Sequence, residues 1–234
     1  MAHYLIEFRL RGFAKKYSQN LIKEVGRKFR VRGMKDKVSH ITLFGPFTTN
    51  NERAMVSEVL NVCKQYDRIY FSIKGVDYFN NPTNKVVFLD ITPSEDLKQF
   101  RQHLSSRLRN IVSTKSKEDS KNKDDFVFHS TIAFKDVGSK LNSILNHLKN
   151  KKHPNIRQTL LRVTIIKNGR ILYEYDFLLK QLLNRYESLS KRIWLRTISI
   201  LKQRPRPPLI TKKTETTKHE KSLWNKIKSF FKGQ

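Results

Sequence analysis

The hydrophobic and polar positions of the chain switch between two periodicities, one typical of strands and one typical of helices. Strand-like segments alternate or form short apolar runs, and they end at turn-forming residues such as Gly45-Pro46. Helix-like segments repeat their apolar side chains every three or four positions. The expected strands are residues 2–10, 38–44, 69–79, 85–91, 126–134, 160–167 and 170–177. The expected helices are residues 13–30, 52–66 and 139–149, with another starting within 92–95 and reaching 108.

Three local signals complete the order of elements. Asn168-Gly169 lies between the last two expected strands and predicts a tight hairpin turn. Residues 113–125 are charged and poor in apolar side chains, so we expect a mobile loop there. A strand that begins with His-x-Thr and is followed by a loop and a helix occurs twice. The sequence therefore predicts an α+β fold with mainly antiparallel pairing and a two-lobed, pseudo-symmetric arrangement.

The composition changes after residue 183. We expect a two-lobed domain over residues 1–183 and a basic C-terminal extension over residues 184–234. In the extension we expect a helix, a Pro-rich linker, a disordered polar stretch and a short amphipathic segment, over residues 188–201, 205–208, 211–220 and 222–232. The amphipathic segment could lie on an anionic membrane, contact RNA phosphates, or do neither.

The charge and the composition narrow the class of protein. A net charge of +28, from 48 Lys and Arg against 20 Asp and Glu, favours a polyanionic partner, although simple solubility is the alternative. No run of about 20 apolar residues could span a membrane, and no signal peptide is evident, so a cytoplasmic protein is expected, as a monomer. The single cysteine, Cys63, excludes an intramolecular disulfide and a Cys-cluster metal site.

Candidate chemistry comes from His-x-Thr/Ser triplets, of which the chain has three. In a strand, residues i and i+2 point to the same face, so His40 projects with Thr42, and His129 with Thr131. His103 begins the third triplet but lies in a helical stretch, where i and i+2 diverge by roughly 200°. We therefore retain only the triplets that begin at His40 and His129.

Two imidazole–hydroxyl pairs suit chemistry at a phosphodiester. One histidine can act as general base and the other as general acid, because an unperturbed pKa near 6.5 permits both roles. Threonine hydroxyls can donate to the non-bridging phosphate oxygens. No cofactor or metal need be involved, and the sequence has no clustered set of metal ligands. The alternative is a structural histidine beside a strand-favouring threonine, but the duplication favours a site.

The stretches His40-Ile41-Thr42-Leu43 and His129-Ser130-Thr131-Ile132 resemble the paired signatures of the 2H phosphoesterase superfamily. The resemblance is strongest to the 2′,5′ RNA ligase and RNA 2′,3′-cyclic phosphodiesterase group, and it covers roughly residues 1–180. It implies two antiparallel sheets that flank a central cleft, with helices outside. It also implies that both histidines act on a cyclic or diester phosphate at an RNA end, in hydrolysis or in the reverse 2′-5′ ligation. By analogy His40 is the general acid and His129 the base, although the residues alone leave that assignment open.

Four further residues bear on the resemblance to the 2H phosphoesterases. Ser130 is polar where the family usually has an apolar residue or proline. Lys135 shares a face with the second motif by alternation, so it could hold phosphate or be a solvated strand end. Phe44, on the face of the first motif, and Phe47, in the following loop, could stack on a base or pack in the core.

A rival function is an RNA-binding module that retains the 2H fold with little or no catalysis. The charge alone would suit such a module. The complete set of two histidines and two threonines favours the enzyme, because binding does not require that set.

Overall fold

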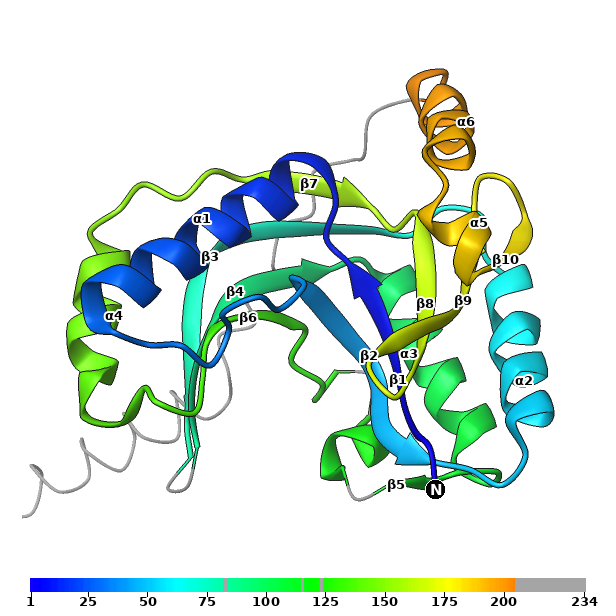
Figure 1. Ribbon diagram of the computed structural model, residues 1–234, viewed down its shortest axis with the longest axis horizontal. Coiled ribbons are helices and arrows are strands. Elements are labelled where there is room, and N and C mark those ends of the chain that lie inside the picture. Colours follow the sequence, from blue (N-terminus) through cyan, green and yellow to red (C-terminus); the bar gives the residue numbers. More distant parts are fainter. Residues whose placement is uncertain (82–83, 115, 123, 205–234) are drawn as a thin grey trace, which may run out of the picture.

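Two antiparallel sheets form the frame of the molecule (Figure 1). A computed structural model describes residues 1–81, 84–114, 116–122 and 124–204. The larger sheet has the order β10-β9-β8-β1-β2-β5, and the smaller sheet has the order β6-β4-β3-β7. The strands of the larger sheet are β1 (His3–Arg9), β2 (His40–Thr48), β5 (Ser113–Thr114), β8 (Arg162–Lys167), β9 (Arg170–Asp176) and β10 (Gln181–Asn184). Those of the smaller sheet are β3 (Tyr70–Asn80), β4 (Lys85–Pro93), β6 (His129–Ala133) and β7 (Ile156–Thr159). The predicted α+β class with two antiparallel sheets is confirmed.

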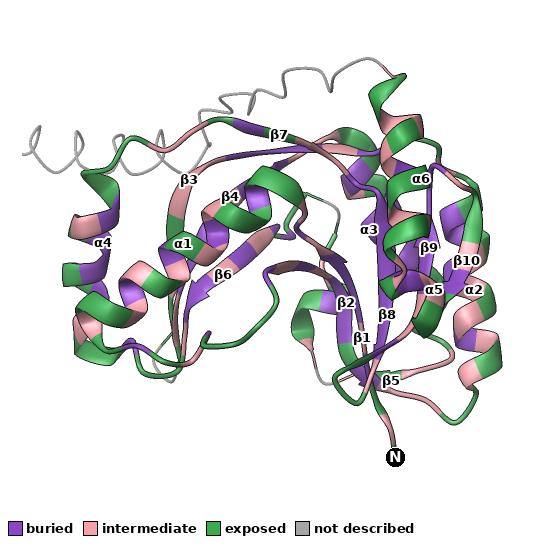
Figure 2. Ribbon diagram, turned by 45° about the horizontal axis from the view of Figure 1, so that its top comes forward, coloured by how far each residue is buried: buried purple, intermediate pink, exposed green. Residues whose placement is uncertain are grey.

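Helices pack on the outer sides of this frame. Helix α1 contacts β6, α4 contacts β3 and β4, α2 packs on α3, and α3 contacts β2, β3 and β4. Helix α4 turns its buried positions toward β3 and its exposed positions outward (Figure 2). The α-helices are α1 (Gly12–Phe29), α2 (Glu52–Lys64), α3 (Glu95–Leu108), α4 (Leu141–Lys149), α5 (Arg185–Leu189) and α6 (Lys191–Lys202), with 3-10 turns η1 (Lys117–Ser120) and η2 (Gly138–Lys140). None of the helices in the described ranges has the length and apolar character to cross a bilayer.

One hydrophobic core joins the two sheets. Its buried side chains come from strands of both sheets and from α1 to α4. The ring of Phe8 on β1 meets the ring of Phe71 on β3, with centroids 5.2 Å apart in an edge-to-face arrangement. The two lobes are therefore packed against each other as one body.

The two motifs occupy equivalent positions in the two sheets. His40 pairs with Arg9 of β1, and His129 pairs with Asp90 of β4. In both cases the histidine is the first residue of its strand. The strands β2 and β6 also contact each other where the sheets meet.

The two motif strands also share an irregularity in the way they pair with their neighbouring strands. In β2 the register shifts at Leu43, three residues after His40, and in β6 it shifts at Ile132, three residues after His129. Each strand thus carries one extra residue at the same place, which is a β-bulge. The matching bulges support the pseudo-symmetry that the internal repeat predicts.

Several boundaries differ from those expected. Strand β2 continues through Gly45-Pro46 to Thr48, because its end pairs with β1 on one side and β5 on the other. The hairpin at Asn168-Gly169 is as predicted, with φ of 50° and 76° at the two turn residues. The short strands β7 and β10 escaped prediction, because four residues are too few to show a periodicity.

Residues 113–125, expected to be a mobile loop, contain β5 and η1 and are attached by buried charged side chains. The carboxylate of Asp119 accepts the backbone N–H of Gly45 at 3.0 Å. The guanidinium of Arg101, on α3, donates to the carbonyl of Lys121 at 2.7 Å. Both side chains are almost completely buried. The prediction of a mobile loop from the low apolar content of these residues is therefore wrong, because buried charged side chains hold the segment against the rest of the fold.

A buried ionic network holds α5 and α6 to the larger sheet. The guanidinium of Arg162 donates to Asp176 at 2.7 Å, to Glu174 at 3.2 Å and to the hydroxyl of Thr197 on α6 at 3.0 Å. All four side chains are at most 2% exposed. The guanidinium also lies 5.2 Å from the ring centroid of Trp194. The expected helix at residues 188–201 is present for most of its length as α6, and the short helix α5 precedes it. The linker, polar stretch and amphipathic segment expected beyond it lie outside the described residues.

This network generates a stability prediction. Replacing Arg162 by Met would leave Asp176 buried without this cation and Glu174 with Arg11 alone, at 3.3 Å, so the free energy of unfolding should fall by about 3–5 kcal/mol. Urea denaturation of wild type and variant measures the change. Arg170→Met, at an exposed position on the adjacent strand, is the matched control and should change stability little. Equal losses in the two variants would contradict the assignment.

Candidate active site

The two histidine rings are held in the same way, each by the carbonyl two residues earlier. Nδ1 of His40 lies 2.8 Å from the carbonyl oxygen of Val38, and Nδ1 of His129 lies 2.9 Å from that of Val127. A carbonyl oxygen only accepts hydrogen bonds, so each Nδ1 carries the proton. In each neutral ring the lone pair is therefore on Nε2, which remains for proton transfer with another group.

Each histidine is accompanied by its threonine, as strand parity predicts. Thr42 and Thr131 are partly exposed, whereas the intervening Ile41 and Ser130 are buried on the opposite side. Within the described ranges neither threonine hydroxyl has a hydrogen-bond partner. Both hydroxyls are therefore available to donate to an anion bound beside the rings.

The two pairs come together where the sheets meet. The strands that carry them, β2 and β6, are in contact. The charge of His40 contributes to lowering the pKa of His129, so the two imidazoles interact electrostatically. An arrangement of two imidazoles and two hydroxyls that no described residue engages can bind one phosphate and exchange protons on two sides of it.

The surroundings of His129 are apolar. Its ring meets the ring of Phe79 edge-on, with centroids 5.1 Å apart, and lies 5.2 Å from the ring of Phe88. Burial among these groups is the largest cause that lowers the pKa of His129, and it outweighs the hydrogen bond to Val127, which acts in the opposite direction. His129 is therefore neutral near pH 7, with the Nε2 lone pair able to accept a proton.

The surroundings of His40 are charged. The carboxylate of Glu7 lies 3.7 Å from Nε2 of His40, and its other oxygen accepts a hydrogen bond from Nε of Arg9 at 2.7 Å. Glu7 is only 4% exposed. In the ladders Glu7 pairs with Thr42 exactly where Phe88 pairs with Thr131 in the other lobe. Equivalent positions thus supply a carboxylate to one histidine and an aromatic ring to the other.

Sequence reasoning missed these four neighbours of the histidines. Glu7 and Arg9 gave a usable signal, since they are ionisable residues at alternate positions of a segment that is otherwise hydrophobic from Tyr4 to Leu10. Phe79 and Phe88 gave none, because their approach to His129 depends on how β3, β4 and β6 pair.

Phe44 and Phe47 are core residues in the structure. The prediction that Phe44 shares the face of His40 is wrong, because the bulge at Leu43 reverses the alternation and pairs Phe44 with Ile6. Phe44 is 0% and Phe47 is 2% exposed, and their rings pack edge-to-face at 5.4 Å. Neither ring is presented to a base, so the core-packing interpretation holds.

Lys135 and Ser130 also depart from the simple alternation. Strand β6 ends at Ala133, and Lys135 has a φ of 70°, so the expected shared face with His129 does not apply. Lys135 is exposed, in the turn that follows β6. Ser130 is completely buried, and its hydroxyl has no hydrogen-bond partner in the part of the chain that is described.

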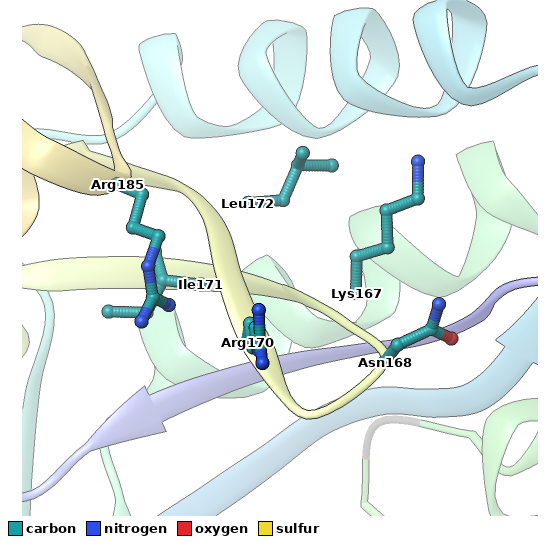
Figure 3. Close-up of a pocket in the computed structure, with 6 residues that line it drawn as sticks. All are labelled: Lys167, Asn168, Arg170, Ile171, Leu172 and Arg185. Atoms are coloured by element: carbon teal, nitrogen blue, oxygen red, sulfur yellow. The ribbon is translucent and has the colours of Figure 1, made fainter.

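No group of three or more His, Cys, Asp or Glu side chains in the described ranges is arranged to hold a metal ion. An open pocket of about 500 Å³ lies elsewhere, at the turn between β8 and β9 (Figure 3). Lys167 in this pocket pairs with Tyr4, whereas His40 pairs with Arg9, so the pocket is roughly 17 Å along β1 from the histidines. Its lining residues are Lys167, Asn168, Arg170, Ile171, Leu172 and Arg185. The pocket is separate from the candidate site.

The chain is similar to known proteins at the level of family and at the level of structure. The family model for the 2'-5' RNA ligase superfamily matches residues 16–171, which include both motifs. Among solved structures, Kluyveromyces marxianus Usb1 is 11% identical, with a TM-score of 0.45, and the match covers 78% of this chain and 97% of that one. The same protein with uridine monophosphate is 10% identical, with a TM-score of 0.47 and the same coverage. The search of curated proteins finds no match.

The aromatic surroundings of His129 can be tested by titration. Phe79→Ala should admit water beside the ring and raise the pKa of His129 toward the ordinary value near 6.5, because burial is what lowers it. NMR titration of the histidine ring protons measures this shift. Tyr78→Ala, which removes the exposed aromatic residue next in the strand, is the control and should leave the titration unchanged. An unchanged midpoint in Phe79→Ala would show that this ring does not cause the shift.

Proposed function

Because the chain belongs to the 2'-5' RNA ligase superfamily, a group of two-histidine phosphoesterases, we propose that it is a phosphoesterase that hydrolyses 2′,3′-cyclic phosphate at RNA ends. The observation that carries the proposal is the duplicated geometry. His40 and His129 are oriented by equivalent carbonyl hydrogen bonds and lie on contacting strands. Each lies beside a threonine whose hydroxyl has no hydrogen-bond partner among the described residues.

In the proposed hydrolysis a water molecule attacks the phosphorus and loses its proton to Nε2 of His129. The bond from phosphorus to one ribose oxygen breaks, and His40 donates a proton to that oxygen from Nε2. Thr42 and Thr131 donate to the non-bridging oxygens, where negative charge increases in the transition state. The product is a phosphate monoester, and one proton has moved to the leaving oxygen. In the reverse ligation the two histidines exchange roles.

The unequal surroundings support this assignment of acid and base. His129 lies among aromatic rings that favour its neutral form, which is the form a base needs. His40 lies beside the Glu7 carboxylate, which can pair with its imidazolium form. An aromatic environment around one histidine and a carboxylate beside the other are the kind of difference expected between a general base and a general acid.

Removing either histidine tests the proposal. We expect His40→Ala and His129→Ala each to lower turnover of a nucleoside 2′,3′-cyclic phosphate by about 10²–10⁴-fold, because each removes one proton-transfer group. His103→Ala is a matched control, since His103 begins the same kind of triplet but lies on α3 and bonds to the hydroxyl of Tyr66. If wild type is no faster than the two active-site variants, the catalytic proposal fails, and the rival RNA-binding module remains.

Glu7 and the leaving group test which histidine is the acid. Glu7→Gln should lower kcat on the cyclic phosphate by roughly tenfold or more, with little change in KM, because it removes the charge beside the general acid. The loss should shrink on an aryl phosphodiester, whose phenolate leaves without being protonated. His40→Ala should show the same dependence on the leaving group, whereas His129→Ala should lose activity on both substrates. Equal losses of Glu7→Gln on both substrates would contradict the assignment.

A further inference from the structure

A basic surface forms where the loop before the first motif meets the turn after the second. We call it the basic junction and define it as residues 30–37 and 134–140. It carries six cations against two carboxylates, a net charge of +4. The cations are Arg30, Arg32, Lys35, Lys37, Lys135 and Lys140, and the carboxylates are Asp36 and Asp136.

The two halves of the basic junction are fixed to each other through backbone contacts. The carboxylate of Asp136 accepts the N–H groups of Arg32, at 2.6 Å, and Gly33, at 3.3 Å. The backbone of Gly33 lies so close to the carbonyl of Phe134 that a Cβ atom at residue 33 would be 2.1 Å from its oxygen. The Asp136 carboxylate is thus hydrogen-bonded to backbone groups, and the charge of nearby Lys140 also acts on it.

The cations of the basic junction are available to an external anion. Five of the six are exposed, and Lys140 is partly buried. None of the six forms an ion pair with a carboxylate elsewhere in the described ranges. Other basic side chains do, such as Lys167 with Glu52 at 2.6 Å. A compact group of unpaired cations on a fixed backbone is suited to binding a polyanion.

The position of the basic junction connects it to the candidate site. Lys37 is three residues before His40, and Lys135 is two residues beyond the end of β6. The segment between α1 and β2 passes beside the segment between β6 and α4 (Figure 1). A polymer whose end occupies the site can therefore pass over the cations next to both motifs.

We propose that the basic junction binds the backbone phosphates of the single-stranded RNA that leads away from the reacting phosphate. This inference rests on the proposed function for the identity of the polymer. Contacts of lysine and arginine with phosphates carry no base information, so the binding tolerates any sequence and weakens as salt concentration rises. The junction thus supplies affinity for a chain, while the histidines act only at its end.

The salt dependence of RNA binding tests the basic junction. Arg32→Ala/Lys35→Ala/Lys37→Ala is compared with Lys15→Ala/Lys16→Ala/Lys23→Ala, which removes three exposed lysines from α1. Both sets are made in a His40→Ala/His129→Ala background, so that the oligoribonucleotide with a 2′,3′-cyclic phosphate end is not consumed. A single-strand phosphate contact contributes a log–log slope of about −0.7, so the junction variant should lose about 2 from its slope and the control almost none.

Two outcomes would overturn the inference. One is a junction variant whose slope equals that of the α1 control. The other is loss of binding to anionic phospholipid vesicles with RNA binding unchanged, which would assign this surface to a membrane. Turnover of a mononucleoside 2′,3′-cyclic phosphate by the wild-type chain tests the proposed function separately, because that substrate has no chain to bind. A failed slope test with intact turnover therefore rejects the basic junction alone.

Discussion

The hydrogen bonds from the imidazole Nδ1 atoms to the carbonyls of Val38 and Val127 determine what the rest of the site can do. They fix the tautomer and the direction of both rings, and so present Nε2 of each ring for proton transfer. Both carbonyls belong to the residue two positions before a strand begins, so ring orientation follows from the way the chain enters β2 and β6. A threonine two residues later, or a carboxylate on the next strand, matters only because the rings already point the required way.

The protein combines a symmetric backbone with asymmetric chemistry. Both motif strands begin at the histidine and bulge at the residue after the threonine. The paired strands then place Glu7 in one lobe where the other has Phe88. The duplicated frame thus surrounds two identical imidazoles with different groups, through a single difference on each neighbouring strand.

The local sequence pattern was sufficient to predict the main helices and strands and the hairpin at Asn168-Gly169. It also predicted that each histidine shares a strand face with its threonine. It failed where pairing between distant strands decides the outcome. A bulge that depends on β1 turns Phe44 into the core, and the partners of His129 come from β3 and β4. It failed also where charge replaces apolar packing, as with Arg101 and Asp119 in residues 113–125, and with Arg162 beneath α6.

The contact between Gly33 and Phe134, together with the Asp136 hydrogen bonds, has a mechanical consequence. It joins the segment that enters the first motif to the segment that leaves the second. A hinge motion that separated the two sheets would have to break those hydrogen bonds and expose the core they share. The two histidines are therefore expected to keep a nearly constant spacing.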